Sequence, residues 1–309
     1  MWPSCLLFNN IIKAEDEEES DGEHSSLVES YPCGQSSSNG KCHVAALPCS
    51  HFVEVPHINQ LDSWDCGLAC LVMVFRTVGI DSCDIQTLAE LCCTTRCSLL
   101  YRVRTSIPSL IVCYIRSFEY CSIWTVDLAY LLQKFSISFS YYTVTFGANP
   151  NYSGETFYKE QLPNDLARVD TLFQKAREAG VSIQCRSISR EEICFLILCG
   201  KYIAIVLVDQ YKLSRSCSDD VFVSDFYGSN SGYTGHYVII CGYDSATDEF
   251  EIRDPACSRK HERVSSTCLE EARKSFGTDE DLLLISLKRS GKQNSPSIQR
   301  SARDNIDCR

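Results

Sequence analysis

The order of apolar and polar positions predicts a helical first half for the folded part of the chain. A dense apolar run over 66–78 predicts a buried helix that ends at Gly79. Two more helices are predicted over 84–93 and 125–135, the latter capped by Thr125. Residues 165–179 carry apolar side chains at helical spacing and predict an amphipathic helix.

Strand patterns dominate after residue 200. Residues 202–208 form a continuous apolar run that predicts a central strand, and 282–287 predict a last strand. Residues 237–242 and 250–253 flank a polar turn over 244–248, which is typical of a β-hairpin.

Two more helices are predicted around these strands by capping boxes, Ser189 with Glu192 and Thr267 with Glu270; the first of them runs to about Cys199. Helices come first and an antiparallel sheet second, so the predicted class is α+β.

Polar, low-periodicity segments bound this folded region. Residues 1–50 read as a disordered acidic lead and 288–309 as a disordered tail, leaving 51–287 as one domain. Residues 97–121 lack periodicity, and removing them would leave a short connection between two predicted helices. We therefore expect 97–121 to be a poorly packed insertion from splicing or a gene-model error, with a long surface loop as the alternative.

Charge and cysteine content restrict the possible binding partners and the cellular compartment of the protein. The net charge is −11, part of it in the run 15–19, so nucleic-acid binding is disfavoured. The 20 cysteines invite a disulfide interpretation, but many lie in apolar runs, and no pair of CxxC motifs follows metal-site spacing. No secretory signal and no stretch long enough to span a membrane is visible. These observations favour reduced thiols in the cytoplasm, with the nucleus as the alternative compartment.

The strongest local signal for chemistry is a cysteine at the start of the predicted helix over 66–78. The positive end of a helix dipole favours the thiolate, which is the nucleophilic form, and this position belongs to Cys66. We expect the small Gly67 to let substrate approach the sulfur. Gln60 precedes the helix and is a candidate donor to an oxyanion.

A thiolate enzyme also needs a base and a group that orients it. His236 begins a predicted strand after a glycine, and Asp254 ends the partner strand of the hairpin. The hairpin would place both at one sheet edge, with Asp254 holding the imidazole through Nδ1–H.

The order Gln60, Cys66, His236, Asp254 resembles the papain-like peptidases, most closely the bacterial double-glycine leader peptidases. The resemblance implies a papain-like fold in which these four residues are oxyanion donor, nucleophile, base and orienting acid. The other candidates have plainer interpretations: Cys70, Cys92 and Cys199 as core thiols, and His51 and His57 as ordinary loop or strand residues.

A second resemblance is carried by the motifs over 55–60, 64–70, 122–132, 147–150 and 235–239. From His51 to about Leu287 the chain is similar to the plant guanylyl cyclases and their animal relatives. That resemblance implies magnesium-dependent conversion of GTP to cyclic GMP. The residues themselves show neither the paired carboxylates of a two-metal cyclase nor a GxxxxGK[ST] phosphate loop. A thiol hydrolase acting on a peptide-like substrate and a non-catalytic binding module therefore stay open as alternatives.

Overall fold

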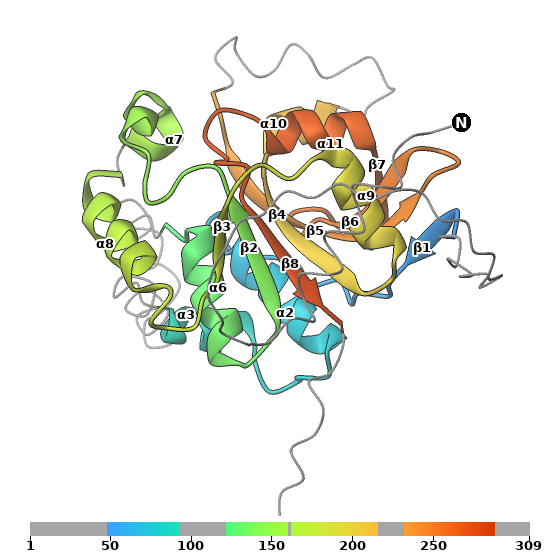
Figure 1. Cartoon of the computed structure of the whole chain (residues 1–309), viewed down its shortest axis with the longest axis horizontal. Helices are drawn as coiled ribbons and strands as arrows, with labels where there is room; N and C mark the ends of the chain where they lie inside the picture. Colours follow the sequence, from blue (N-terminus) through green and yellow to red (C-terminus); the bar gives the residue numbers. More distant parts are fainter. Residues whose placement is uncertain (1–47, 93–121, 160–161, 216–231, 288–309) are drawn as a thin grey trace, which may run out of the picture. The chain divides into compact units, whose positions relative to one another are not determined.

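A mixed β-sheet forms the centre of the structure. The computed structural model describes residues 48–92, 122–159, 162–215 and 232–287. The strand order is β3-β2-β8-β4-β5-β6-β7, with β1 also paired to β5; Figure 1 shows β4, β5 and β8 side by side. Neighbours are antiparallel except for the parallel pair β2 and β3. The strands are β1 Ser50–Phe52, β2 Phe139–Thr143, β3 Ile183–Cys185, β4 Tyr202–Asp209, β5 Gly235–Asp244, β6 Glu249–Arg253, β7 Glu262–Ser265 and β8 Leu282–Ser286.

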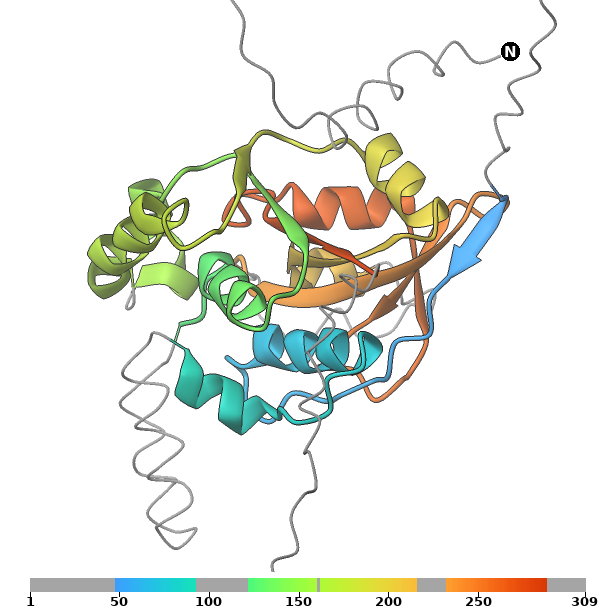
Figure 2. The same cartoon turned by 60° about the horizontal axis from the view of Figure 1, so that its bottom comes forward.

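Helices cover both faces of this sheet. One core contains α2, α3, α6 and α8, and a second contains α9, α10 and α11. Figure 2 separates these layers, with α2 and α3 in cyan on one side and α9 in yellow and α11 in orange on the other. The helices are α2 Cys66–Thr77, α3 Ile85–Leu91, α6 Thr125–Lys134, the 3₁₀ turn η2 Pro150–Gly154, α7 Thr156–Lys159, α8 Leu162–Lys175, α9 Arg190–Leu198, α10 Gln210–Arg215 and α11 Ser266–Arg273.

The central strands β4 and β8 are almost entirely apolar because both of their faces are buried. In β4, Ile203 and Ile205 face the α2 core, whereas Ala204 and Val206 face the α9 core. Successive side chains of a strand point to opposite faces, so a strand between two helical layers carries a continuous apolar run. This explains why the pattern over 202–208 predicted the strand correctly.

The predicted α+β class is confirmed, but the division into a helical half and an antiparallel half is wrong in detail. Strand β2 lies between α6 and α8 in the sequence, and it pairs with β3 in parallel. The pattern of β2 gave no clear signal because Tyr141 packs into one core and its neighbour Tyr142 into the other. Helix α8 also begins and ends earlier than predicted, at Leu162 and Lys175.

Two predicted helix caps are replaced by neighbouring residues. Thr125 does not cap α6; the Asp127 carboxylate accepts the N–H of Trp124, the residue before the helix, at 2.9 Å. Ser265 rather than Thr267 caps α11, with its Oγ accepting the Cys268 N–H at 3.2 Å. The cap predicted for α9 is confirmed.

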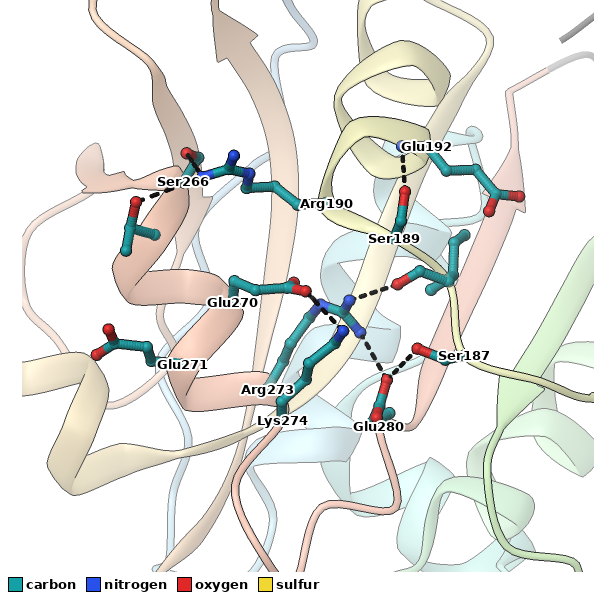
Figure 3. Close-up of polar contacts among 12 residues, drawn as sticks. Ser187, Ser189, Arg190, Glu192, Ser266, Glu270, Glu271, Arg273, Lys274 and Glu280 are labelled. Carbon is teal, nitrogen blue, oxygen red and sulfur yellow. Dashed lines mark hydrogen bonds and ion pairs between the residues drawn. The ribbon is translucent and has the colours of Figure 1, made fainter. Parts of the chain in front are cut away.

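A buried arginine ties α11 to the loop before β8 (Figure 3). Arg273 is 1% exposed; its Nε donates to Glu270 at 2.5 Å, and an NH2 group donates to the Ile188 carbonyl. Its other NH2 group lies 3.5 Å from Glu280. A buried guanidinium must keep such partners, so this network holds the loop that leads into β8.

Three sequence predictions lie outside the described residues. These are the insertion over 97–121, the tail over 288–309 and nearly all of the lead over 1–50. The described part of the lead ends in β1, which pairs with β5.

Candidate functional site

The ends of three elements bring the candidate catalytic residues together. Cys66 is the first residue of α2, His236 is the second residue of β5, and Asp254 directly follows β6. Helix α2 packs on β5, while β5 and β6 form the predicted hairpin. One edge of the sheet therefore presents all three side chains. Their catalytic role stays a prediction.

The imidazole of His236 lies between a carboxylate and a thiol. Its Nε2 is 2.7 Å from Asp254 Oδ1, which also accepts the Ala256 N–H at 2.8 Å. The prediction that Asp254 holds Nδ1 is therefore wrong. Asp254 follows the end of the partner strand and reaches the Nε2 nitrogen of the ring, and Cys66 is the second hydrogen-bond partner of the His236 side chain.

Electrostatics in this site favour a charged imidazole. Burial lowers the pKa of His236, but hydrogen bonds to Asp254 and Cys66 outweigh burial and raise that pKa to about 10. Burial raises the pKa of Asp254, yet the hydrogen bond to His236 holds it below its ordinary value. Both shifts favour an imidazolium paired with a carboxylate, and a positively charged neighbour of this kind is what activates the sulfur in thiol enzymes.

Asp65, the residue before α2, does not cap the helix with its side chain. It is fully buried, and its Oδ1 instead accepts the N–H groups of Leu61 and Asp62, each at 3.1 Å. Asp65 Oδ1 therefore holds the loop before the helix rather than the first turn of α2.

The backbone of Gln60 is hydrogen-bonded to Pro255, the residue that follows Asp254. Its N–H donates to the Pro255 carbonyl at 2.9 Å, and its side-chain Nε2 donates to the Asp62 carbonyl at 2.9 Å. The amide oxygen is buried without a partner. One amide hydrogen is thus engaged in the loop, and the other would be the donor to an oxyanion, a role that stays a prediction.

Gly67 has a different role from the one predicted. A Cβ at this buried position would lie 3.0 Å from Leu128 Cδ1 and 3.1 Å from Tyr237 Cδ2. The glycine therefore lets α2 approach α6 and β5 closely. The expectation that it opens a path for substrate is wrong, because the space is filled by these two side chains.

His57, predicted to be an ordinary loop residue, contacts the site. Its Nε2 lies 2.9 Å from the backbone carbonyl of Asp254. The buried Arg253 adds a second link through Nε, which donates to the Val55 carbonyl at 2.9 Å. The segment that leads to Cys66 is thus fastened to the end of β6. Sequence spacing gave no signal, because 197 residues separate His57 from Asp254.

The thiols predicted to be structural differ in their surroundings. Cys70 is fully buried with its sulfur 3.4 Å from the Tyr237 carbonyl, and burial raises its pKa well above the ordinary value. Cys92 is also buried. Cys199 is only half-buried at the end of α9, so its assignment to the core is wrong. Every cysteine in the described residues is a free thiol.

A carboxylate pair that the sequence did not single out lies before β8. Asp279 Oδ1 accepts the Tyr152 hydroxyl at 2.6 Å, and Asp281 Oδ2 accepts the Tyr141 hydroxyl at 3.2 Å. Burial raises the pKa of both carboxyls, and the charge of Asp279 raises that of Asp281 further. The sequence signal for this pair is an Asp-x-Asp motif directly before an apolar strand.

This pair does not fit a resident magnesium ion. Mg²⁺ usually keeps several waters around it, whereas these two carboxyls are buried and already accept hydrogen bonds from tyrosine hydroxyls. Within the described ranges, no group of three or more His, Cys, Asp or Glu side chains is placed to hold a metal ion.

The match to a protein family covers nearly the same residues as the predicted domain over 51–287. A family model described as guanylylate cyclase matches residues 55–115 and 110–285, so its two parts meet inside the segment 97–121. "Guanylyl cyclase 1" of Arabidopsis thaliana is 55% identical over 298 residues, covering 95% of this chain and 99% of the relative. None of the helices in the described part has the length and apolar character needed to cross a membrane.

Two solved structures show distant likeness. A C39-like peptidase from Bacillus anthracis has a TM-score of 0.40 at 16% identity, over 77% of this chain and 96% of the other. Xylellain, a cysteine protease from Xylella fastidiosa, has a TM-score of 0.40 at 12% identity, over 82% and 91%. The family match and the near full-length identity carry the assignment: this chain belongs to the guanylyl cyclase family.

Proposed function

We propose that this chain converts GTP to cyclic GMP. The observation that carries the proposal is the 55% identity to a protein named Guanylyl cyclase 1 over nearly the whole of both chains. In this reaction the 3′-hydroxyl of GTP attacks the α-phosphorus and loses its proton, and pyrophosphate leaves. We propose that Mg²⁺ arrives as the complex with GTP, where it also offsets repulsion from the net charge of −11.

The test is to incubate the purified full-length protein with GTP and Mg²⁺ and to measure cyclic GMP by mass spectrometry. A thiol has no evident part in this phosphoryl transfer, so Cys66→Ala should keep the activity, whereas EDTA should abolish it. Absence of cyclic GMP from folded wild-type protein would refute the proposal. Loss of activity in folded Cys66→Ala would instead place the sulfur in the reaction.

A second candidate is a thiol hydrolase or peptidase, favoured by the contact chain from Cys66 through His236 to Asp254. The thiolate would attack a carbonyl carbon and form an S–C bond, and the imidazolium would give its proton to the leaving amine. Water would then cleave the thioester and release the acid. The free thiols of the described residues suit a reducing compartment, which we propose to be the cytoplasm.

This candidate is tested with a mixed peptide library and product analysis by mass spectrometry. Wild-type protein should cleave a subset of peptides, and Cys66→Ala should cleave none. Cys70→Ala is the matched control at a buried thiol of the same helix. Cleavage that persists in Cys66→Ala would rule out this mechanism. A protein that is folded but inactive in both assays would be a non-catalytic binding module on this fold.

A further inference from the structure

The acid of the candidate site begins a tight turn. Asp254 directly follows β6, and its carbonyl accepts the Cys257 N–H at 3.2 Å while its Oδ1 accepts the Ala256 N–H at 2.8 Å. Aspartate at the first position of a β-turn and proline at the second are typical, because Pro255 has a fixed φ and the aspartate side chain accepts an N–H two residues on. The turn 254–257 therefore sets the direction of the carboxylate by local bonds.

His57 holds this turn from a segment outside the hairpin. Its Nε2 lies 2.9 Å from the Asp254 carbonyl oxygen. A carbonyl oxygen can only accept a hydrogen bond, so the ring donates from Nε2. The Gln60 N–H adds a bond to the next carbonyl, that of Pro255, at 2.9 Å. The segment that leads to Cys66 thus contacts the turn at two successive carbonyls, and the side-chain contact comes from His57.

The same carboxylate residue is therefore held between two histidines. His236 lies 2.7 Å from Oδ1 of Asp254, whereas His57 reaches the main chain of Asp254. Burial raises the pKa of Asp254, but the hydrogen bond to His236 and, as a smaller contribution, the His57 ring hold it below the ordinary value. A movement of the turn by about 1 Å would take the carboxylate out of hydrogen-bond range of His236.

We propose that His57 is a positioning residue of the candidate site, which holds the turn 254–257 so that the Asp254 carboxylate stays on His236. In this role it acts through Asp254 and not on the sulfur of Cys66. The inference rests on the thiol-hydrolase candidate and adds a residue on which that mechanism depends. If His57 were an ordinary loop residue, its substitution would lower stability without changing the chemistry of His236.

The test is an NMR titration of the His236 ring in the full-length protein and in two variants of His57. His57→Leu removes the donor, whereas His57→Gln keeps an amide N–H of similar reach. With the donor removed, the pKa of His236, about 10 in the wild type, should fall by at least about one unit, which is roughly tenfold in protonation. The pKa in His57→Gln should stay close to the wild-type value.

A double variant tests whether His57 acts through Asp254. The Asp254→Asn substitution already removes the charge that His57 is proposed to position. Adding His57→Leu to Asp254→Asn should therefore lower the pKa of His236 no further, because two substitutions on one chain of contacts are not additive. A further drop as large as that in the single variant would contradict the proposal.

His51 offers the matched control. It is half-buried in β1, its ring lies beside Gly200, and it pairs with Tyr243 near the other end of β5 from His236. His51→Leu should leave the pKa of His236 unchanged. Thermal melts establish that each variant is folded, and His57→Asn, with a side chain too short to reach the carbonyl, replaces His57→Leu if that variant does not fold.

The outcomes separate this inference from the thiol-hydrolase candidate. An unchanged pKa of His236 in folded His57→Leu overturns the positioning role, and so does an equal fall in His57→Leu and His57→Gln. Peptide cleavage by the wild type is measured in parallel and should be reduced in His57→Leu and retained in His57→Gln. Absence of cleavage by the wild type would refute the hydrolase candidate, while the titration of His236 would still decide whether His57 positions Asp254.

Discussion

Substituting Asp254 tests the charge chain of the candidate site most directly. The Asp254→Asn side chain has nearly the same shape and can still accept a hydrogen bond, but it removes the negative charge 2.7 Å from His236 Nε2. The hydrogen bond to Asp254 is the largest contribution that raises the pKa of His236. We expect the substitution to lower that pKa and to weaken the support that the ring gives to a Cys66 thiolate.

The size of the effect follows from the pKa of His236, which rises from 6.5 to about 10. That rise corresponds to roughly 5 kcal/mol in favour of the protonated ring. Loss of one close carboxylate charge changes a pKa by about 1–3 units. The pKa of His236 in the variant would then be about 7–9, so alkylation of Cys66 should change little at pH 6 and should slow by roughly twofold to 90-fold at pH 9, where the ring of the variant has lost its proton.

The assay is site-resolved alkylation by iodoacetamide, followed by peptide mapping in a mass spectrometer between pH 5 and 9. The exposed Cys185 and the half-buried Cys199 serve as internal reference thiols. Wild-type Cys66 should react faster than both below neutral pH. A parallel NMR titration of the His236 ring should show the lowered pKa directly.

Two results would refute this reasoning. Cys66 that alkylates no faster than Cys199 in folded wild type would exclude an activated thiol. An unchanged Cys66 rate in Asp254→Asn at pH 9 would show that the carboxylate does not act through the ring. The folded pKa of His236 is raised, so its stability contribution is fully present below pH 6.5 and lost as pH rises through about 10; urea unfolding should show that loss in the wild type and a smaller one in the variant.

Two pairs of substitutions, each a test and its control, examine packing and buried charge. Gly67→Ala should lower the free energy of unfolding by about 1–3 kcal/mol in urea titrations, because its Cβ meets Leu128; Gly154→Ala, where a Cβ meets nothing within 4 Å, should have little effect. Asp281→Asn should raise Tm more at pH 8 than at pH 4, because the raised pKa of Asp281 costs stability as pH rises. Asp84, whose pKa is lowered by its bond to the Thr87 N–H, should show the opposite pH trend when changed to Asn. Equal effects within either pair would contradict the corresponding argument.

Much of the fold followed from local pattern. The buried helix α2, the central strand β4 and the β5–β6 hairpin were predictable because each element buries side chains with its own periodicity. Strand β2 was not, because it places adjacent tyrosines in two different cores. Because both of its faces are buried, its sequence does not alternate between apolar and polar residues, and only the two helical layers explain its pattern.

The candidate site shows the same division. Sequence alone determined the residue types and their order, since a cysteine at a helix start and a histidine and an aspartate at the ends of a hairpin can be recognised locally. The tertiary structure decided that Nε2 faces Asp254, that Asp65 turns away from the start of α2, and that His57 fastens the site. These contacts depend on side-chain direction and on segments distant in sequence, which no local pattern encodes.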